Sequence, residues 1–151
     1  MNRKRLTVIA TENELCLLEN KADVLITGVG ALNVISALKD VPRETPLYNI
    51  GYAGSNTLEI GHEVLIGKVF HYHPNVTFSE PCFELQGDVT CYTNNDFVLE
   101  TAIDEPCVFD MELAYILAMG FKDVIARKVV SDNLSLERYN DTIHKDTEVR
   151  G

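Results

Sequence analysis

The stretch Val108-Phe-Asp-Met-Glu-Leu-Ala114 decides the fold when it is taken together with Val129-Val-Ser-Asp-Asn133, one helix and one strand later. Glu112 falls in the first turn of an expected helix, where a carboxylate can accept hydrogen bonds from two adjacent sugar hydroxyls. Asp132 follows an apolar, strand-like run and could give a proton to a purine ring nitrogen. Together the two acids have the chemistry that cleavage of an N-glycosidic bond requires.

Apolar runs rich in β-branched residues alternate with helix-period stretches along the chain. Strands are expected at residues 6–10, 24–27, 47–50, 64–72 and 124–130, and helices at 12–19, 31–38 and 111–119. This alternation predicts an α/β layer sandwich. With 151 residues and 46% hydrophobic content, the chain is expected to form a single domain spanning residues 1–151.

The charge balance argues against a nucleic-acid partner. A formal net charge of -10 and a pI near 4.7 oppose binding to a phosphate backbone, which needs a cationic surface. No apolar run approaches the roughly 20 residues that span a bilayer, so no membrane partner is expected. The basic start Asn2-Arg-Lys-Arg5 leads into a run too short for a signal-peptide core, which favours a cytoplasmic protein.

Several weaker patterns point away from metals and cofactors. The cysteines at 16, 82, 91 and 107 show no Cys-x-x-Cys spacing and favour buried free thiols. Gly28-Val-Gly30 lies between a strand and a helix, but Asn33 replaces the third glycine of a dinucleotide-binding motif. His71 and His73 alternate without an evident third ligand, so a surface or interface role is the better interpretation. We therefore expect no metal and no cofactor.

The Met-Glu and Ser-Asp dipeptides at 111–112 and 131–132 resemble those of the purine nucleoside phosphorylase and methylthioadenosine/S-adenosylhomocysteine nucleosidase superfamily. Other segments follow in that superfamily's order: Ala10-Thr-Glu-Asn-Glu-Leu15, Asn49-Ile-Gly-Tyr-Ala-Gly-Ser55 and Asn94-Asn-Asp-Phe-Val98. The resemblance implies a three-layer sandwich with a central mixed, twisted sheet flanked by helices. It also implies a cytoplasmic homodimer that acts on a small-molecule purine nucleoside.

The resemblance assigns roles to individual residues. Asp132 would protonate the base at N7, and Glu14 would take a proton from water. The remaining roles are ribose binding by Met111 and Glu112, base binding by Phe97, Val98 and Ser131, and a nucleophile site at Tyr52, Ala53 and Gly54.

Each acid also has a structural alternative that stays open. Thr11-x-x-Glu14 fits a helix capping box, in which Glu14 returns to the cap backbone. Asp132 could cap a helix that begins near Ser135. Any acid at the position of Glu112 would be favoured by the helix dipole, by about 0.3 to 1 kcal/mol.

The nucleophile separates a hydrolase from a phosphorylase. Phosphate needs Arg, Lys or a cluster of amides, whereas this chain has Asn49 where phosphorylases of the superfamily place an arginine. Glu14 would repel phosphate, and the bulk of Tyr52 is expected to narrow the nucleophile site. The leading hypothesis is hydrolysis of a 5′-modified adenine nucleoside resembling methylthioadenosine or S-adenosylhomocysteine. The alternatives are a phosphorylase that uses Lys128 or Arg43, and a catalytically silent nucleoside-binding module.

Two pieces of the superfamily's pattern are expected to be missing. Only residues 15–22 separate the Glu14 helix from the next strand, where relatives insert further helix and a hairpin. The chain also stops soon after Tyr139, where relatives end in a long helix.

Overall fold

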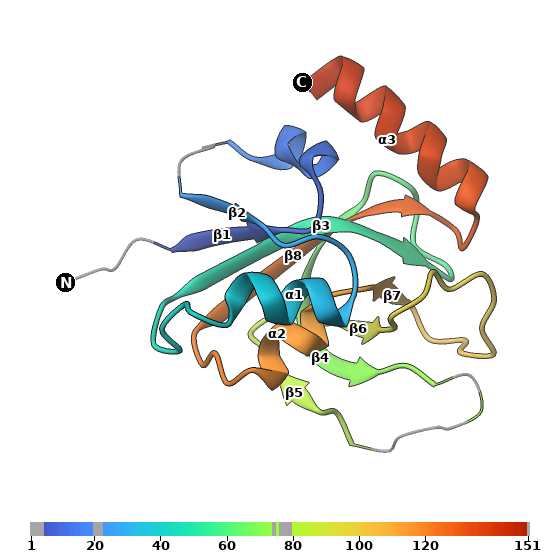
Figure 1. Cartoon of the computed structure of the whole chain (residues 1–151). Coiled ribbons are helices and arrows are strands. Elements are labelled where there is room, and N and C mark those ends of the chain that lie inside the picture. Colours follow the sequence, from blue (N-terminus) through green and yellow to red (C-terminus); the bar gives the residue numbers. More distant parts are fainter. Residues whose placement is uncertain (1–4, 20–22, 74, 76–79, 151) are drawn as a thin grey trace.

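The computed structural model describes residues 5–19, 23–73, 75 and 80–150, so residues 2–4 of the basic start lie outside it. Eight strands, a short 3-10 helix (η1) and three α-helices form this part of the chain (Figure 1). The elements in chain order are β1 Leu6–Ile9, η1 Glu12–Leu17, β2 Val24–Ile26, α1 Ala31–Leu38, β3 Leu47–Ser55, β4 Glu63–His71, β5 Phe83–Glu84, β6 Val89–Thr93, β7 Cys107–Asp110, α2 Leu113–Ala118, β8 Val124–Asp132 and α3 Leu136–Arg150.

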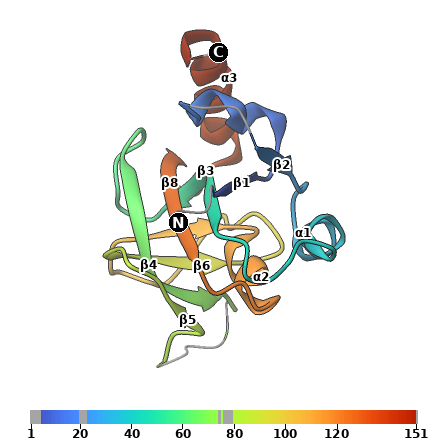
Figure 2. The same ribbon diagram turned by 90° about the vertical axis from the view of Figure 1, so that its left-hand side faces the viewer.

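The sheet is mixed and closes on itself. β3 pairs in parallel with β8 and then, at Gly54 and Ser55, antiparallel with β7. β7 pairs with β6, β6 with β4, and β4 with β8, so five strands form a ring. β1 and β2 extend the sheet from β3, and β5 extends it from β4 (Figure 2). The mixed sheet was predicted, whereas its closure was not.

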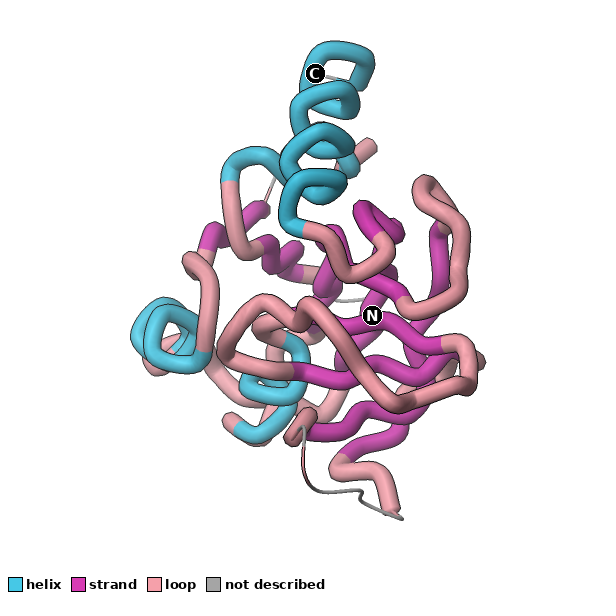
Figure 3. The backbone as a smooth tube through the Cα atoms, turned by 90° about the vertical axis from the view of Figure 1, so that its right-hand side faces the viewer, coloured by secondary structure: helices cyan, strands magenta, loops and turns pink. Residues whose placement is uncertain are grey.

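Helices cover the sheet on two sides, which gives the three expected layers. α1 and α2 lie on one side and η1 and α3 on the other (Figures 1 and 3). The larger core packs Val34 and Leu38 of α1 and Leu113 of α2 against the strands. A smaller core packs Leu17 of η1 and Ile143 of α3 against the opposite side. Burial of these apolar side chains holds the layers together.

All five expected strands are present, and β3 and β8 run further than predicted, to Ser55 and Asp132. Three strands, β5 to β7, were missed. β5 and β7 have only two and four residues, and two of the five residues of β6 are threonines. α2 begins at Leu113 instead of residue 111, so Glu112 is its N-cap residue and lies just before the first turn.

The expectation that the chain lacks a long final helix was wrong. α3 runs for 15 residues from Leu136. Its sequence, LERYNDTIHKDTEVR, is so polar that apolar residues do not recur at the spacing of three or four positions that indicates a helix. Tyr139 and Ile143, four residues apart, pack it onto the smaller core. The helix predicted for residues 12–19 is shorter and is a 3-10 helix; residues 20–22 lie outside the described part.

Within the described ranges, no helix is both long and apolar enough to cross a membrane. The same residues contain no cluster of three His, Cys, Asp or Glu side chains placed to hold a metal ion. All four cysteines are free, as predicted, but only Cys91 and Cys107 are buried; Cys16 is half-buried and Cys82 is exposed.

Candidate active site

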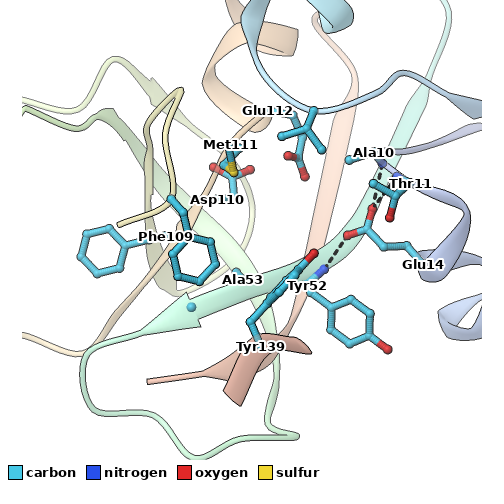
Figure 4. Close-up of a pocket in the computed structure, with 13 residues that line it drawn as sticks. Ala10, Thr11, Glu14, Tyr52, Ala53, Phe109, Asp110, Met111, Glu112 and Tyr139 are labelled. Carbon is cyan, nitrogen blue, oxygen red and sulfur yellow. Dashed lines mark hydrogen bonds between the residues drawn. The ribbon is translucent and has the colours of Figure 1, made fainter. Parts of the chain in front are cut away.

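A cavity of about 190 Å³ opens where β1, β3 and β7 end (Figure 4). The carboxyl ends of strands are a common place for ligand sites in α/β sheets, since loops and helix starts converge there. Acids, aromatic rings and glycine surround the space. Its lining consists of Ala10, Thr11, Glu14, Val29, Tyr52, Ala53, Gly54, Phe97, Phe109, Asp110, Met111, Glu112 and Tyr139.

Glu14 is buried at one wall of the cavity, and backbone amides fix its carboxylate. Oε1 accepts hydrogen bonds from the N–H groups of Ala10 (2.8 Å) and Thr11 (3.2 Å). Oε2 accepts one from the N–H of Tyr52 at 2.7 Å. The bond from the Thr11 N–H is the half of the predicted capping box that Glu14 makes, whereas the Thr11 hydroxyl has no hydrogen-bond partner among the described residues. Glu14 thus closes the start of η1 and also faces the cavity.

The bond to Tyr52 depends on a glycine beside it. A Cβ on Gly51 would lie 2.4 Å from Glu14 Oε2, so only glycine lets the carboxylate reach β3. Burial raises the pKa of Glu14 above its ordinary value, although the charge of Lys128 and the three amides oppose that shift.

Asp110 and Glu112 lie on the opposite wall and share one buried cation. Lys128 Nζ is 3.0 Å from Glu112 Oε1 and 3.1 Å from Asp110 Oδ2, and the lysine is completely buried. Asp110 is fixed further by the Thr93 hydroxyl, 2.5 Å from Oδ1, and by the N–H of Leu113, 2.8 Å from Oδ2. Asp110 therefore caps α2 and positions the lysine.

The acids that surround Lys128 change the pKa of Glu112 and the pKa of Lys128 itself. Burial raises the pKa of Glu112 to about 7; Lys128 opposes this shift, and the charges of Asp110 and Glu14 add to it. Burial alone would lower the pKa of Lys128, but Glu112 and Asp110 raise it above its ordinary value. The lysine consequently keeps its charge, and the raised pKa values of Glu112 and Glu14 make both acids easier to protonate than a free carboxylic acid.

Aromatic side chains close the cavity from the α3 side. The ring of Tyr139 meets that of Phe97 edge to face, with centroids 5.5 Å apart. Figure 4 shows Tyr139 extending from α3 toward Glu112 and Glu14. Burial raises the pKa of Tyr139 to about 12, and the charges of Glu14, Glu112 and Asp132 act in the same direction. All three acids thus lie close enough to one phenol to influence it.

Asp132 lies outside the lining of this cavity. Its Oδ1 accepts a hydrogen bond from the Ser131 hydroxyl at 2.6 Å, and its Oδ2 accepts bonds from the N–H groups of Leu134 (2.9 Å) and Ser135 (3.2 Å). Both amides precede α3, and the helix is capped by Ser135, whose hydroxyl accepts a hydrogen bond from the N–H of Arg138 at 3.3 Å. Asp132 therefore holds the turn before the helix and does not cap the helix itself. Burial raises the pKa of Asp132 against these hydrogen bonds.

Gly54 is all that separates Asp132 from the cavity wall. The glycine lines the cavity, and a Cβ on it would come within 2.9 Å of Asp132 Oδ2. A smaller neighbouring space of about 20 Å³ lies between Gly54, Phe97, Val98 and Leu134. Ser131 is buried and lines neither space.

The side chain of Tyr52 contributes less to the site than expected. Its hydroxyl donates to Asp146 Oδ2 of α3 at 2.7 Å and lies 3.4 Å from Cys16 Sγ of η1. In Figure 4 its ring extends away from Glu112. What Tyr52 gives the site is its backbone N–H, and its bulk is turned toward α3.

Sequence reasoning missed the roles of Asp110, Lys128, Thr93 and Tyr139 at the site. A lysine inside the apolar run 124–130 was the available signal, because a buried lysine needs carboxylate partners. Tyr139 carried no such signal, since α3 itself was not predicted.

Neither cation proposed for phosphate faces the cavity. Lys128 is fully buried behind Asp110 and Glu112. Arg43 donates to the carbonyls of Leu38, Val41 and Met119 and stacks on Phe121, away from the lining.

The fold is the one that the resemblance predicted, because solved nucleosidase structures share it. The solved structures with this fold include the MTAN of Chlamydia trachomatis bound to MTA, with a TM-score of 0.72 and 17% identity over 95% of this chain and 91% of that one. The S-adenosylhomocysteine nucleosidase of Streptococcus pyogenes in complex with 5-methylthiotubericidin has a TM-score of 0.68 and 15% identity over the same shares. The futalosine hydrolase of Helicobacter pylori has a TM-score of 0.68 and 12% identity over 95% and 92%. No protein-family model and no curated protein matches the sequence.

Proposed function

We propose that this chain is a purine nucleosidase that hydrolyses the N-glycosidic bond of a 5′-modified adenine nucleoside. The observation that carries the proposal is the cavity itself, in which two buried acids from distant segments, Glu14 and Glu112, face one space. Asp110 also lines this space, and Asp132, the remaining acid of the proposed mechanism, lies behind Gly54. Solved structures of the same fold are nucleosidases and a futalosine hydrolase, which supports this class of reaction.

The proposed reaction breaks the bond between C1′ and N9 and forms one between C1′ and a water oxygen. Glu14 takes the proton of the attacking water, and Asp132 gives its own proton to N7, so the purine leaves as a neutral base. Glu112 accepts hydrogen bonds from the ribose 2′- and 3′-hydroxyls, and Met111 packs against the sugar. Phe97 stacks on the base, with Val98 and Ser131 at its edge.

Asp132 must turn to reach the base. Its Oδ2 is held by the amides of Leu134 and Ser135. We propose that substrate binding breaks the hydrogen bonds to these two amides, and that the carboxyl group then binds N7 of the purine instead. The raised pKa of Asp132 supports its role as an acid, because the protonated form is the one that acts.

Water is favoured over phosphate as the nucleophile because carboxylates dominate the polar lining. Glu14, Asp110 and Glu112 all face the cavity, and a phosphate dianion there would be repelled. A phosphate-dependent phosphorylase remains the second candidate, since the same Asp132 chemistry would serve it. A silent nucleoside-binding module is the third, favoured by the hydrogen bonds that already occupy Asp132.

Methylthioadenosine is the first substrate to test, because the MTAN of similar fold is bound to MTA. The proposed setting is the cytoplasm, where free nucleosides are available, with neither nucleic acid nor membrane as a partner. The net charge of -10 supports this, since it disfavours polyanionic surfaces.

A homodimer is proposed through the face of α1. Leu32 is 84% exposed, Ile35 46% and Val29 40%, and Val29 also lines the cavity. An apolar patch of this kind is typical of an interaction surface. A second copy seated there would cover the patch and border the cavity.

One assay tests the function. Purified protein is incubated with methylthioadenosine, S-adenosylhomocysteine and unmodified purine nucleosides, with and without phosphate, and free base is followed by chromatography. We expect adenine release in phosphate-free buffer, fastest for a 5′-modified nucleoside. Strict dependence on phosphate would establish the phosphorylase instead, and nucleoside binding without any base release would establish the silent module.

A further inference from the structure

We infer that Lys128 is a positioning residue that keeps Glu112 charged and fixed so that it can bind sugar hydroxyls. This inference rests on the proposed function and names the group that controls its sugar site. Lys128 is not itself part of the cavity lining; it acts through the carboxylates of Glu112 and Asp110, at 3.0 Å and 3.1 Å.

Burying an ammonium group at this position carries a large cost. Lys128 is among the largest fully buried side chains, and it sits in the interior of β8 opposite Gly51 of β3. A charged ammonium in such a place is tolerated only with carboxylate partners. A strand that needed only packing at this position would have an apolar residue. The charge is retained where it contacts two acids of the cavity wall.

The acids around Lys128 outnumber it. Asp110 from β7, Glu112 at the start of α2 and Glu14 from η1 all interact with the same ammonium, and Cys91 of β6 and Tyr139 of α3 lie in the same environment. One cation cannot neutralise three carboxylates, so one acid has to gain a proton first. Asp110 also accepts hydrogen bonds from Thr93 and Leu113, and Glu14 accepts three from backbone N–H groups. The Glu112 carboxylate accepts a hydrogen bond from Lys128, so its charge depends most directly on the lysine.

The consequence for binding follows from the chemistry of the carboxyl group. A charged Glu112 accepts hydrogen bonds from both ribose hydroxyls, whereas a protonated one loses an acceptor and binds the pair poorly. Lys128 therefore sets the pH below which a nucleoside is lost. Asp110 works against it, because its charge favours protonation of Glu112.

Two substitutions should move this pH in opposite directions. Lys128→Met removes the cation and should raise the pKa of Glu112. Nucleoside binding at neutral pH should then fall about tenfold for each pH unit by which that pKa exceeds neutrality, and it should recover as the pH rises. Asp110→Asn removes the competing charge and should extend binding to lower pH. Lys128→Arg, which keeps the charge, should leave the Glu112 titration closer to that of the unaltered protein than Lys128→Met does.

The experiment measures two quantities on each variant between about pH 5 and pH 9. Carbon-13 NMR of glutamate-labelled protein follows the titration of Glu112 without any ligand, and calorimetry follows binding of methylthioadenosine. A Glu112 titration that does not move in Lys128→Met or in Asp110→Asn overturns the inference while leaving the proposed function standing. If Lys128→Met does not fold, the direction of the Asp110→Asn change decides alone. Absence of nucleoside binding in the unaltered protein defeats the proposed function, and the titration still reports on Lys128.

Discussion

Asp132 shows most clearly how one side chain can satisfy a structural and a chemical explanation together. Its carboxylate accepts backbone bonds that hold the turn before α3, and burial raises its pKa, as an acid catalyst would need. It lies directly behind Gly54 of the cavity wall. The bonds of the turn hold the carboxyl group beside the place where a purine nitrogen would be bound.

Replacing Asp132 with Asn tests the acid directly. Asn can still accept a hydrogen bond but has no carboxyl proton to give, so base release should fall by about 10² to 10⁴. Turnover and nucleoside affinity are measured together, and affinity should change little. Asp104→Asn, at an exposed position, is the matched control and should behave like the unaltered protein. Normal turnover in Asp132→Asn would remove this residue from the mechanism.

At the scale of elements, β3 organises the site through its small residues. Gly51 leaves room for Glu14, and Gly54 leaves room for Asp132, three positions apart on the same strand. At Gly54 the strand pairs with Asp132 of β8 and also with Phe109 of β7, which brings the ends of these three strands together beside the cavity. The spacing of two glycines thus fixes the separation of two acids.

Substituting Gly51 with Ala should prevent Glu14 from acting as the proposed general base. The new Cβ would lie 2.4 Å from Glu14 Oε2, so the carboxylate must leave the Tyr52 amide. Loss of that buried bond should destabilise the fold by about 1–3 kcal/mol and remove most turnover. Urea unfolding and base release are the measurements.

Gly61→Ala serves as the control for this substitution. Its φ of +92° makes alanine strained there, but no atom lies within 4 Å of the new Cβ. It should lose stability and keep turnover. Equal losses of turnover in the two variants would mean that Gly51 acts through stability alone.

The elements differ in how far the sequence could predict them. The start of β3 at Leu47 to Ile50 was predicted, but its continuation to Ser55 was missed, because two glycines and a serine in that part do not favour a strand. β7 was missed because the four residues after Pro106 are too few to show the alternation of apolar and polar residues that indicates a strand. α3 was missed because its apolar contacts rest on few residues, chiefly Tyr139 and Ile143.

For the whole molecule, the raised pKa values make stability depend on pH. Folding raises the pKa of Glu112 from its ordinary value of 4.5 to about 7, so between these values the folded state binds more protons than the unfolded state. Stability should therefore fall as the pH rises through this range, by up to about 1.4 kcal/mol per pH unit for one proton. The net charge of -10 acts in the same direction, because self-repulsion grows as acids ionise.

Urea midpoints from about pH 5 to pH 8 check this dependence. Glu112→Gln should flatten the curve, since it removes the group that titrates. A midpoint that rises with pH in the unaltered protein would contradict the assignment.

The association state is the second prediction at this scale. Leu32→Glu places a charge on the exposed face of α1 and should shift a dimer to monomer in light scattering, because that face would no longer be apolar. Leu99, which is 61% exposed, offers the matched control, since Leu99→Glu adds the same charge elsewhere. A Leu32→Glu protein of unchanged mass would rule out the α1 face.

The site was only partly predictable from the sequence, because some of its contacts depend on how the whole sheet closes. Order along the sequence gave Glu14, Met111, Glu112 and the Tyr52–Gly54 segment, all of which line the cavity. The pairing of Lys128 with Asp110 joins β8 to β7, strands that are not neighbours in the sheet. Such a contact depends on closure of the sheet, and no local pattern contains that information.

The closed ring of five strands also limits how a ligand can reach the cavity. The ring has no unpaired strand edge, so opening it would break backbone hydrogen bonds without replacing them. Entry and exit are left to lining residues outside these five strands, which include Val29, Phe97 and Tyr139. Because α3 carries Tyr139 and follows the two amides that bind Asp132, we expect a shift of α3 on substrate entry to disturb those amides too.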